Sequence, residues 1–215
     1  LDSAFTKMFR LRFCKNFPST LFENLFNEKD IRGILKKRDK DLITMVLIGQ
    51  RDFDKLKTIL KKYNIKSDIS DMDIEPFSSK KDIKYLVYDI KDLDEMVIKK
   101  LEIENGKHIV IVSAFSCGFS EKLLDDIFTD EKLRKIFNDY GIILFNDFSP
   151  QSLLFTKLHY AFKDIYLIYK EKSFKDFKLN VFPSIYFIKD GKIIKQIEGN
   201  SENLLEEFKK IALDN

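Results

Sequence analysis

The sequence has 215 residues, of which 44% are hydrophobic and 34% charged, with 38 basic and 35 acidic side chains and a net charge of +3. This composition excludes a disordered chain, and the length suffices for one large domain or two small ones. The lysine-rich runs at 36–40 and 55–66 alternate with apolar positions, which favours solvated helix faces over a nucleic-acid surface. The longest apolar run, 42–49, is far shorter than the roughly 18 residues that cross a bilayer.

The first ninety residues carry the pattern of a small α/β region. Apolar residues at helical spacing predict two helices, the first with a break near Asn27. Two short apolar runs predict buried strands, and a polar stretch with Pro76 predicts a loop between the second helix and the second strand. The expected elements are helices over 19–37 and 52–65, strands over 42–49 and 83–90, and a loop over 66–82.

The remaining residues predict an alternation of strands and helices that ends in a hairpin. The dipeptide Asp190–Gly191 is a favoured hairpin turn between two apolar runs. The expected helices are 92–106, 120–128, 130–140, 149–162, a short one at 173–179, and 202–213. The expected strands are 107–115, 141–147 and 164–170, followed by the hairpin 181–199. We therefore expect an N-terminal α/β region over 1–91 and a second domain over 92–215.

Cys117 is the residue whose position most clearly indicates chemical reactivity. It follows an apolar strand and begins a helix, where unpaired backbone N–H groups and the positive end of the helix dipole favour thiolate, the attacking form of cysteine. Ser120 stands one turn later, where a dithiol enzyme carries its second sulfur. The other cysteine, Cys14, is expected to be a half-buried apolar residue. No cluster of His and Cys at zinc spacing accompanies them, so we expect no metal and no cofactor.

The order of elements around Cys117 resembles the thioredoxin superfamily over about residues 92–215. The sequence is most similar to thiol-disulfide interchange domains, which have an alanine three residues before the cysteine and a segment like "FTDEKL" after it; these are Ala114 and 128–133 here. The stretch "FPSIYFIKDGKIIKQIEG" (182–199) resembles the family segment that runs from a cis-proline through a hairpin. The resemblance implies a thioredoxin-like fold, a mixed sheet flanked by helices, with an N-terminal extension.

The resemblance also implies a site around the Cys-Gly-Phe-Ser sequence. Its catalytic positions are Cys117 and Ser120, and its substrate-binding positions are Ser116, Gly118, Phe119, Phe182 and Pro183. Pro183, if its peptide bond is cis, lies opposite Cys117 and leaves the backbone at Phe182 to pair with an extended substrate.

Departures from the family pattern leave more than one function open. Ser120 cannot resolve a mixed disulfide, and Ser116 and Ile111 replace a common tryptophan and a buried acid. One interpretation is a monothiol oxidoreductase or isomerase that uses Cys117 alone, and the other is a non-catalytic module that binds extended polypeptide near Pro183. Ser120 is either native or a replacement for a cysteine. "CGFS" also occurs in monothiol glutaredoxins that bind an iron–sulfur cluster, but the surrounding sequence differs, as it does from peroxiredoxins.

Partners and compartment are expectations from the resemblance and the N-terminus. The implied partners are protein thiols or disulfides, with a low-molecular-weight thiol or a redox protein as the resolving agent, and no nucleic acid. Because similar interchange proteins act outside the bacterial cytoplasm and the chain begins at Leu1, we expect a periplasmic or membrane-anchored protein whose N-terminal signal or anchor has been removed.

Overall fold

The computed structural model describes residues 19–66, 73–75, 83–92, 95–115, 117–199 and 203–214. The chain divides into two compact units, residues 1–71 and 72–215. This division lies before the sequence-predicted domain boundary between residues 91 and 92. None of the helices in the described ranges is both long and apolar enough to cross a membrane.

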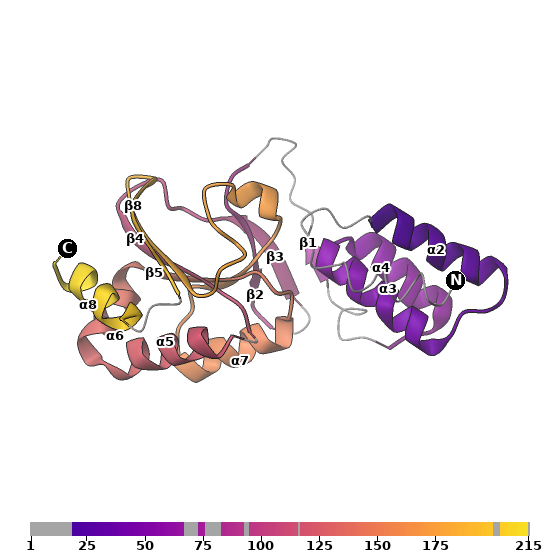
Figure 1. Ribbon diagram of the computed structural model, residues 1–215, viewed down its shortest axis with the longest axis horizontal. Helices are drawn as coiled ribbons and strands as arrows, with labels where there is room; N and C mark the ends of the chain where they lie inside the picture. Colours follow the sequence, from indigo (N-terminus) through magenta and orange to yellow (C-terminus); the bar gives the residue numbers. More distant parts are fainter. Residues whose placement is uncertain are drawn as a thin grey trace. The chain divides into compact units, whose positions relative to one another are not determined.

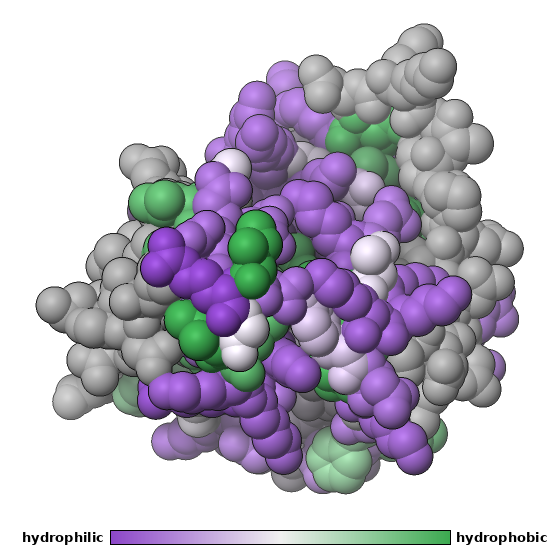
Figure 2. Space-filling view, turned by 90° about the vertical axis from the view of Figure 1, so that its right-hand side faces the viewer, coloured by the Kyte–Doolittle hydropathy of each residue, from purple (hydrophilic) through white to green (hydrophobic). Residues whose placement is uncertain are grey.

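In its described part, the N-terminal unit consists of three helices, α2 (Ser19–Ile31), α3 (Lys37–Gln50) and α4 (Phe53–Tyr63). Lys29 of α2 is fully buried, and its ammonium group lies 2.5 Å from the carboxylate of Asp39 in the first turn of α3. The Asp39 carboxylate also accepts a hydrogen bond from the backbone N–H of Lys36. One side chain thus caps α3 and pairs with the buried charge of α2, which links the two helices. Figure 2 views the molecule from the side that lies at the right in Figure 1, and the surface seen there is mainly hydrophilic with separate hydrophobic spots.

The predicted strand over 42–49 is wrong, because these residues belong to α3. Its buried residues Leu42, Ile43, Val46 and Leu47 follow helical spacing, which an eight-residue apolar run does not reveal by itself. The predicted helix over 52–65 is confirmed as α4. The predicted helix over 19–37 is confirmed as α2 only as far as Ile31, and α2 continues past Asn27 without the expected break.

The C-terminal unit is built on a mixed eight-stranded sheet with the order β1-β3-β2-β6-β5-β4-β7-β8 (Figure 1). β4, β5 and β6 are parallel, and the neighbours on both sides of this group, β2 and β7, run antiparallel to it. The strands are β1 (Asp73–Glu75), β2 (Leu86–Ile90), β3 (Glu95–Lys100), β4 (Lys107–Ser113), β5 (Gly141–Phe145), β6 (Ile165–Ile168), β7 (Ser184–Lys189) and β8 (Lys192–Glu198). This mixed sheet with flanking helices confirms the predicted α/β fold class.

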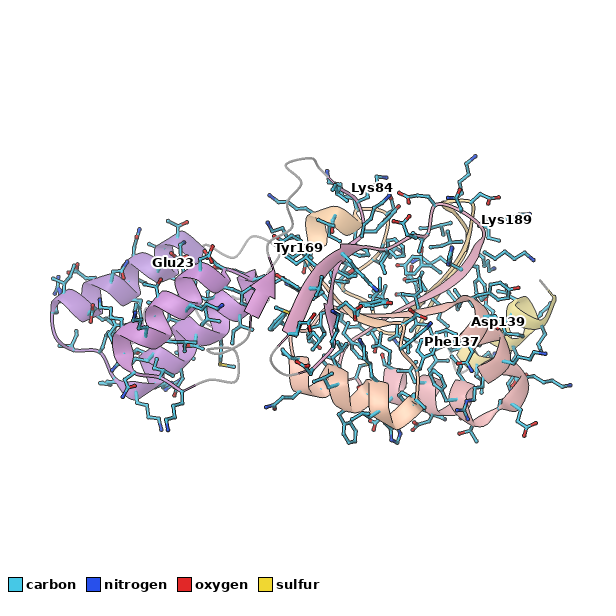
Figure 3. The ribbon with its side chains drawn as sticks, turned by 180° about the vertical axis from the view of Figure 1, so that it is seen from behind. Glu23, Lys84, Phe137, Asp139, Tyr169 and Lys189 are labelled. Carbon is cyan, nitrogen blue, oxygen red and sulfur yellow. The ribbon has the colours of Figure 1, made fainter. Side chains whose placement is uncertain are left out.

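Helices cover one face of this sheet, and α5, α6 and α7 lie along it (Figure 1). Phe137 of α6 is fully buried and contacts the rings of Phe128 and Phe162, and Figure 3 labels its place. The opposite face carries an aromatic cluster that includes Tyr85, Phe174 and Tyr186. The helices of this unit are α5 (Gly118–Thr129), α6 (Glu131–Tyr140), α7 (Pro150–Tyr160), the 3-10 helix η2 (Glu171–Phe174) and α8 (Leu204–Asp214).

The predicted helix over 92–106 is also wrong, because residues 95–100 form strand β3. Met96 and Ile98 are buried and alternate with less buried neighbours, the two-residue period of a strand. The charged residues around them resembled a solvated helix face in the sequence. β3 pairs antiparallel with β2 and parallel with β1, so residues before 92 extend the sheet.

The remaining elements follow the sequence closely. Asp130 caps α6, because its carboxylate accepts hydrogen bonds from the backbone N–H groups of Lys132 and Leu133. The predicted turn at Asp190–Gly191 joins β7 to β8, with φ angles of 47° and 73°. The strands at 83–90, 107–115, 141–147 and 164–170, and the helices at 120–128, 130–140, 149–162 and 202–213, are confirmed with shifted ends, and η2 occupies the start of the short predicted helix.

Lys157 fixes α7 to the sheet. Its ammonium group lies 2.9 Å from the carboxylate of Asp89 and 3.0 Å from the carbonyl oxygen of Ile90, both on β2. Burial opposes ionisation of Asp89, but hydrogen bonds from Lys157 and Lys99 outweigh it and hold the pKa of that carboxyl below its usual range. The ion pair between Lys157 and Asp89 thus connects α7, the helix between β5 and β6, to strand β2.

The end of β8 makes close backbone contact with the segment before β7. A Cβ added at Gly199 would lie 2.3 Å from the carbonyl oxygen of Pro183 and 2.7 Å from its nitrogen. In real proteins, a Cβ atom is essentially never found within 3.0 Å of a non-bonded backbone atom. Glycine at this position therefore lets the chain carrying Phe182 and Pro183 reach its place.

We predict that Gly199→Ala lowers the free energy of unfolding by about 1–3 kcal/mol, because the new methyl group overlaps backbone atoms that cannot move aside cheaply. Urea unfolding measures the loss. The matched control is Gly118→Ala, since nothing lies within 4 Å of a Cβ at Gly118. Within a helix, alanine is more stable than glycine by about 0.5–1 kcal/mol, so this variant should not lose stability. Equal stabilities for the two variants would contradict the close approach at Pro183.

Candidate functional site

The ends of three adjacent strands bring the candidate site together. Ser113 at the end of β4 pairs with Phe145 at the end of β5, and Val112 pairs with Ser184 at the start of β7. The segment after β4 therefore runs between the segment after β5 and the segment before β7. Cys117 and Phe182, far apart in the sequence, are brought side by side in this way.

The turn that leads into Cys117 is held by its neighbours. The backbone N–H of Phe115 donates to the carboxylate of Asp147, at 3.1 Å, and the Phe115 ring stacks on Phe145 with a centroid distance of 3.9 Å. The N–H of Cys117 donates to the carbonyl oxygen of Ala114 at 3.1 Å. These contacts define where α5 begins.

Cys117 is the N-cap residue of α5 and has extended backbone angles, φ −99° and ψ 103°. Its carbonyl oxygen accepts from the N–H of Glu121, and its half-buried thiol is free of any disulfide. The Sγ atom lies 3.5 Å from the carbonyl oxygen of Phe182, to which the thiol donates. The thiol therefore stands at the surface, between the helix start and the segment that precedes β7.

The backbone of Phe182 lies beside the thiol, and Pro183 is the next residue of the chain. The peptide bond between them is cis. Phe182 packs its partly buried ring against the aromatic cluster that includes Tyr85, Phe174 and Tyr186, and Pro183 is buried. The polar contact with Cys117 is made by the backbone of Phe182.

Ser120 lies in the first turn of α5 and is only 1% exposed. Its hydroxyl has no hydrogen-bond partner among the described residues. Gly118 is exposed, and Phe119 leaves 65% of its surface in contact with water. The same turn thus presents one thiol and one aromatic ring outward while it buries the hydroxyl that stands in the second-sulfur position.

Two residues named in the sequence analysis, Ser116 and Cys14, lie outside the described residues. The predicted substrate-binding role of Ser116 stays a prediction. In the part of the chain that the structure describes, no group of three or more His, Cys, Asp or Glu side chains is placed to hold a metal ion.

A groove of about 560 Å³ opens beside Cys117, between α5 and α7. The sequence did not predict this groove, and it gave no functional role to His159, which lines it. Ser152, Phe155 and His159 recur at helical spacing on α7, which shows that they share a face but not that this face borders Cys117. The groove is lined by Ser113, Ala114, Phe115, Cys117, Glu121, Leu124, Phe145, Gln151, Ser152, Phe155, Thr156, His159 and Tyr160.

Tyr160 joins the two walls of the groove at one end. Its hydroxyl donates to the carboxylate of Asp125 on α5 at 2.8 Å, and its ring stacks on Phe128 with a centroid distance of 4.7 Å. Burial, the hydrogen bond to Asp125 and the nearby charges of Asp125 and Glu121 raise the pKa of Tyr160. The phenol therefore stays neutral and keeps its proton for this bond.

Residues 95–212 match the thioredoxin-like domain family. The chain belongs to this family. The match begins at β3 and extends into α8, so the thioredoxin-like domain includes Cys117 and Pro183 together with the groove beside them. No curated protein matches the chain.

The solved structures that are similar to the chain include the following two. One is a thioredoxin-like protein from Porphyromonas gingivalis, 14% identical, with a TM-score of 0.44 over 60% of this chain and 88% of the other. The second is a thiol:disulfide interchange protein from a Bacteroides species, 16% identical, with a TM-score of 0.42 over 61% of this chain and 88% of the other.

We predict that Ser120→Ala leaves stability unchanged or raises the free energy of unfolding by up to about 1 kcal/mol, because it removes a buried hydroxyl that has no described partner. Ser184→Ala is the matched control. Ser184 is equally buried, but its hydroxyl donates to the carbonyl oxygen of Val181 at 2.7 Å, so its loss should cost about 1 kcal/mol. Urea unfolding compares the two, and a larger cost for Ser120→Ala would show that its hydroxyl is bonded.

Proposed function

We propose that this protein carries out thiol-disulfide exchange with Cys117 as its only nucleophile and with other proteins as its partners. The observation that carries the proposal is the pairing of a half-exposed thiol at the start of α5 with a buried hydroxyl, that of Ser120, one turn later. In a thioredoxin-like site the second position resolves the mixed disulfide, and a hydroxyl cannot do so.

In the proposed reaction the thiolate of Cys117 attacks one sulfur of a partner disulfide. A new S–S bond forms between Cys117 and that sulfur, and the other sulfur leaves as a thiolate that takes a proton from water. An external thiol, of low molecular weight or on a redox protein, then attacks the mixed disulfide and releases Cys117. Each step exchanges one disulfide for another, so the protein gains and loses no electrons over the cycle.

The proposed substrate-binding residues are those around the thiol. We propose that the reacting segment of the partner lies along Phe182 and Pro183 and also contacts Gly118 and the exposed ring of Phe119; the hydrogen bond from Cys117 to the Phe182 carbonyl and the exposure of Phe119 support this. Ser116, immediately before Cys117 in the sequence, completes the proposed contacts. Because disulfides persist in oxidising compartments, we place the protein outside the cytoplasm.

A non-catalytic module that binds extended polypeptide at the same surface is the second candidate. The 65% exposure of Phe119 favours it, because an exposed aromatic ring two residues after Cys117 suits binding with or without exchange. The two candidates differ in whether Cys117 forms a covalent bond, which is directly measurable.

We predict that the chain, with Cys14→Ser so that Cys117 is its only thiol, takes up one peptide per molecule from an excess of a disulfide-linked peptide dimer. Intact-mass spectrometry should show this mixed disulfide, and dithiothreitol should remove it. Cys117→Ser is the control and should show no adduct. Binding of the peptide without an adduct at Cys117 would favour the non-catalytic module.

We further predict that Ser120→Cys in the same background forms an internal disulfide with Cys117 on mild oxidation and gains insulin-reductase activity. One turn of helix places the two Cβ atoms within reach of each other, and the second thiol can expel the bound peptide. Ser120→Ala serves as the control and should keep the stable adduct. A variant with two thiols that oxidises only between molecules would contradict the proposed site.

A further inference from the structure

We infer that the groove between α5 and α7 receives a large apolar side chain of the polypeptide that reacts at Cys117, together with a basic residue next to it. The inference rests on the proposed exchange at Cys117 and adds the class of polypeptide. The thiol itself lines the groove, so a segment bound there has its neighbouring sulfur within reach of the attack. The same thiol donates to the backbone carbonyl oxygen of Phe182, which precedes Pro183.

The groove offers apolar surface that the fold leaves uncovered. Phe155 of α7 borders the groove and is 69% exposed, and Phe115 is partly exposed there, whereas Leu124 and Phe145 also line the groove but are only 2% and 3% exposed. An exposed aromatic ring gains free energy when another apolar group covers it. The volume of about 560 Å³ lies within the range of about 300–1,000 Å³ that is usual for ligand pockets.

Both walls of the groove are held in place before anything binds. α5 is fixed at its start by the turn around Phe115, and α7 is tied to α5 by the bond from Tyr160 to Asp125 and to the sheet by Lys157. A pre-formed groove spares the free energy of ordering that a mobile one would cost. A side chain of the partner can therefore enter without rearrangement of the helices.

The polar groups at the groove favour a cationic neighbour. Glu121 lines the groove, and Asp125 follows it one turn later on the exposed surface of α5. His159, whose ring stacks on Phe155, lies 3.9 Å from the Asp125 carboxylate. None of the described residues that line the groove is a lysine or an arginine. A lysine beside the apolar side chain would meet two carboxylates and no fixed positive charge.

Ser113 adds a polar feature at the floor. The residue is fully buried, lines the groove, and has a hydroxyl without a hydrogen-bond partner in the described part of the chain. A phenol that reached the floor could satisfy this hydroxyl, whereas a purely aliphatic side chain could not. Tyrosine therefore combines the apolar ring and the polar tip that the groove offers.

The test separates binding from exchange. The probe is the peptide Lys-Tyr-Ser-Tyr-Lys, blocked at both ends, whose near-symmetric sequence makes the direction of the bound chain unimportant. Its dissociation constant from the full chain carrying Cys117→Ser is measured by calorimetry at low salt. Replacing both tyrosines by alanine should weaken binding about tenfold or more. Replacing both lysines by glutamine should weaken it about threefold, and added salt should diminish that difference.

Matched variants then locate the contact. Phe155→Ala should weaken the tyrosine peptide about tenfold and leave the alanine peptide unaffected. Leu158→Ala is its control, because Leu158 is 81% exposed on the same helix but does not line the groove. Glu121→Gln should remove the preference for lysine. Its control is Asp139→Asn, on the exposed surface of α6 (Figure 3).

The inference is overturned if the tyrosine and alanine peptides bind equally, or if Phe155→Ala and Leu158→Ala have the same effect. The exchange is tested separately by adding the disulfide-linked dimer of Lys-Tyr-Cys-Tyr-Lys to the Cys14→Ser protein and measuring how fast the mixed disulfide forms. A mixed disulfide that forms equally fast with alanine in place of tyrosine would retain the exchange and reject the groove. Groove-dependent binding without any mixed disulfide would reject the exchange and retain the groove as a peptide site.

Discussion

The central strand β4 is the constraint on which the rest of the C-terminal unit depends. It pairs with β5 on one side and β7 on the other, and Val110, Ile111 and Val112 are completely buried. Burial on both faces fixes its register strongly, because a slip by one residue would exchange all its contacts. The register fixes where these strands begin and end, and each part of the site is attached at one of those points. Cys117 follows β4, α7 follows β5, and Pro183 precedes β7.

The sequence predicted the elements of the C-terminal unit well where long periodic patterns coincided with clear turns. The wrong element types predicted at α3 and β3 have a common physical origin. In both, the burial that decides the structure comes from partners elsewhere in the chain: α3 is buried by α2 and α4, and β3 pairs with β1 and β2. Local patterns of hydrophobic and charged residues could not reveal these partners, and they favoured strand and helix in the wrong places.

The candidate site was predictable to the extent that it depends on the start of one helix. Cys117, Gly118 and Ser120 follow from the strand-to-helix junction, and the position of Phe182 beside them came from the family resemblance. The α5–α7 groove could not be predicted, because it depends on where α7 lies. Lys157 and Tyr160 set that position through Asp89 and Asp125, and neither pairing leaves a trace in the spacing of the sequence.

The buried hydroxyl of Ser120 also bears on how a protein of this kind would respond to its surroundings. A site with two thiols forms an internal disulfide when a small disulfide oxidises it, and two molecules of the small thiol are released. Its oxidised fraction therefore depends on the square of the small thiol's concentration divided by the concentration of the small disulfide. A site with one thiol exchanges one for one, and by mass action its occupancy follows only the ratio of the two. Diluting the thiol pool at constant ratio would then leave Cys117 unchanged, while a dithiol site would become more oxidised.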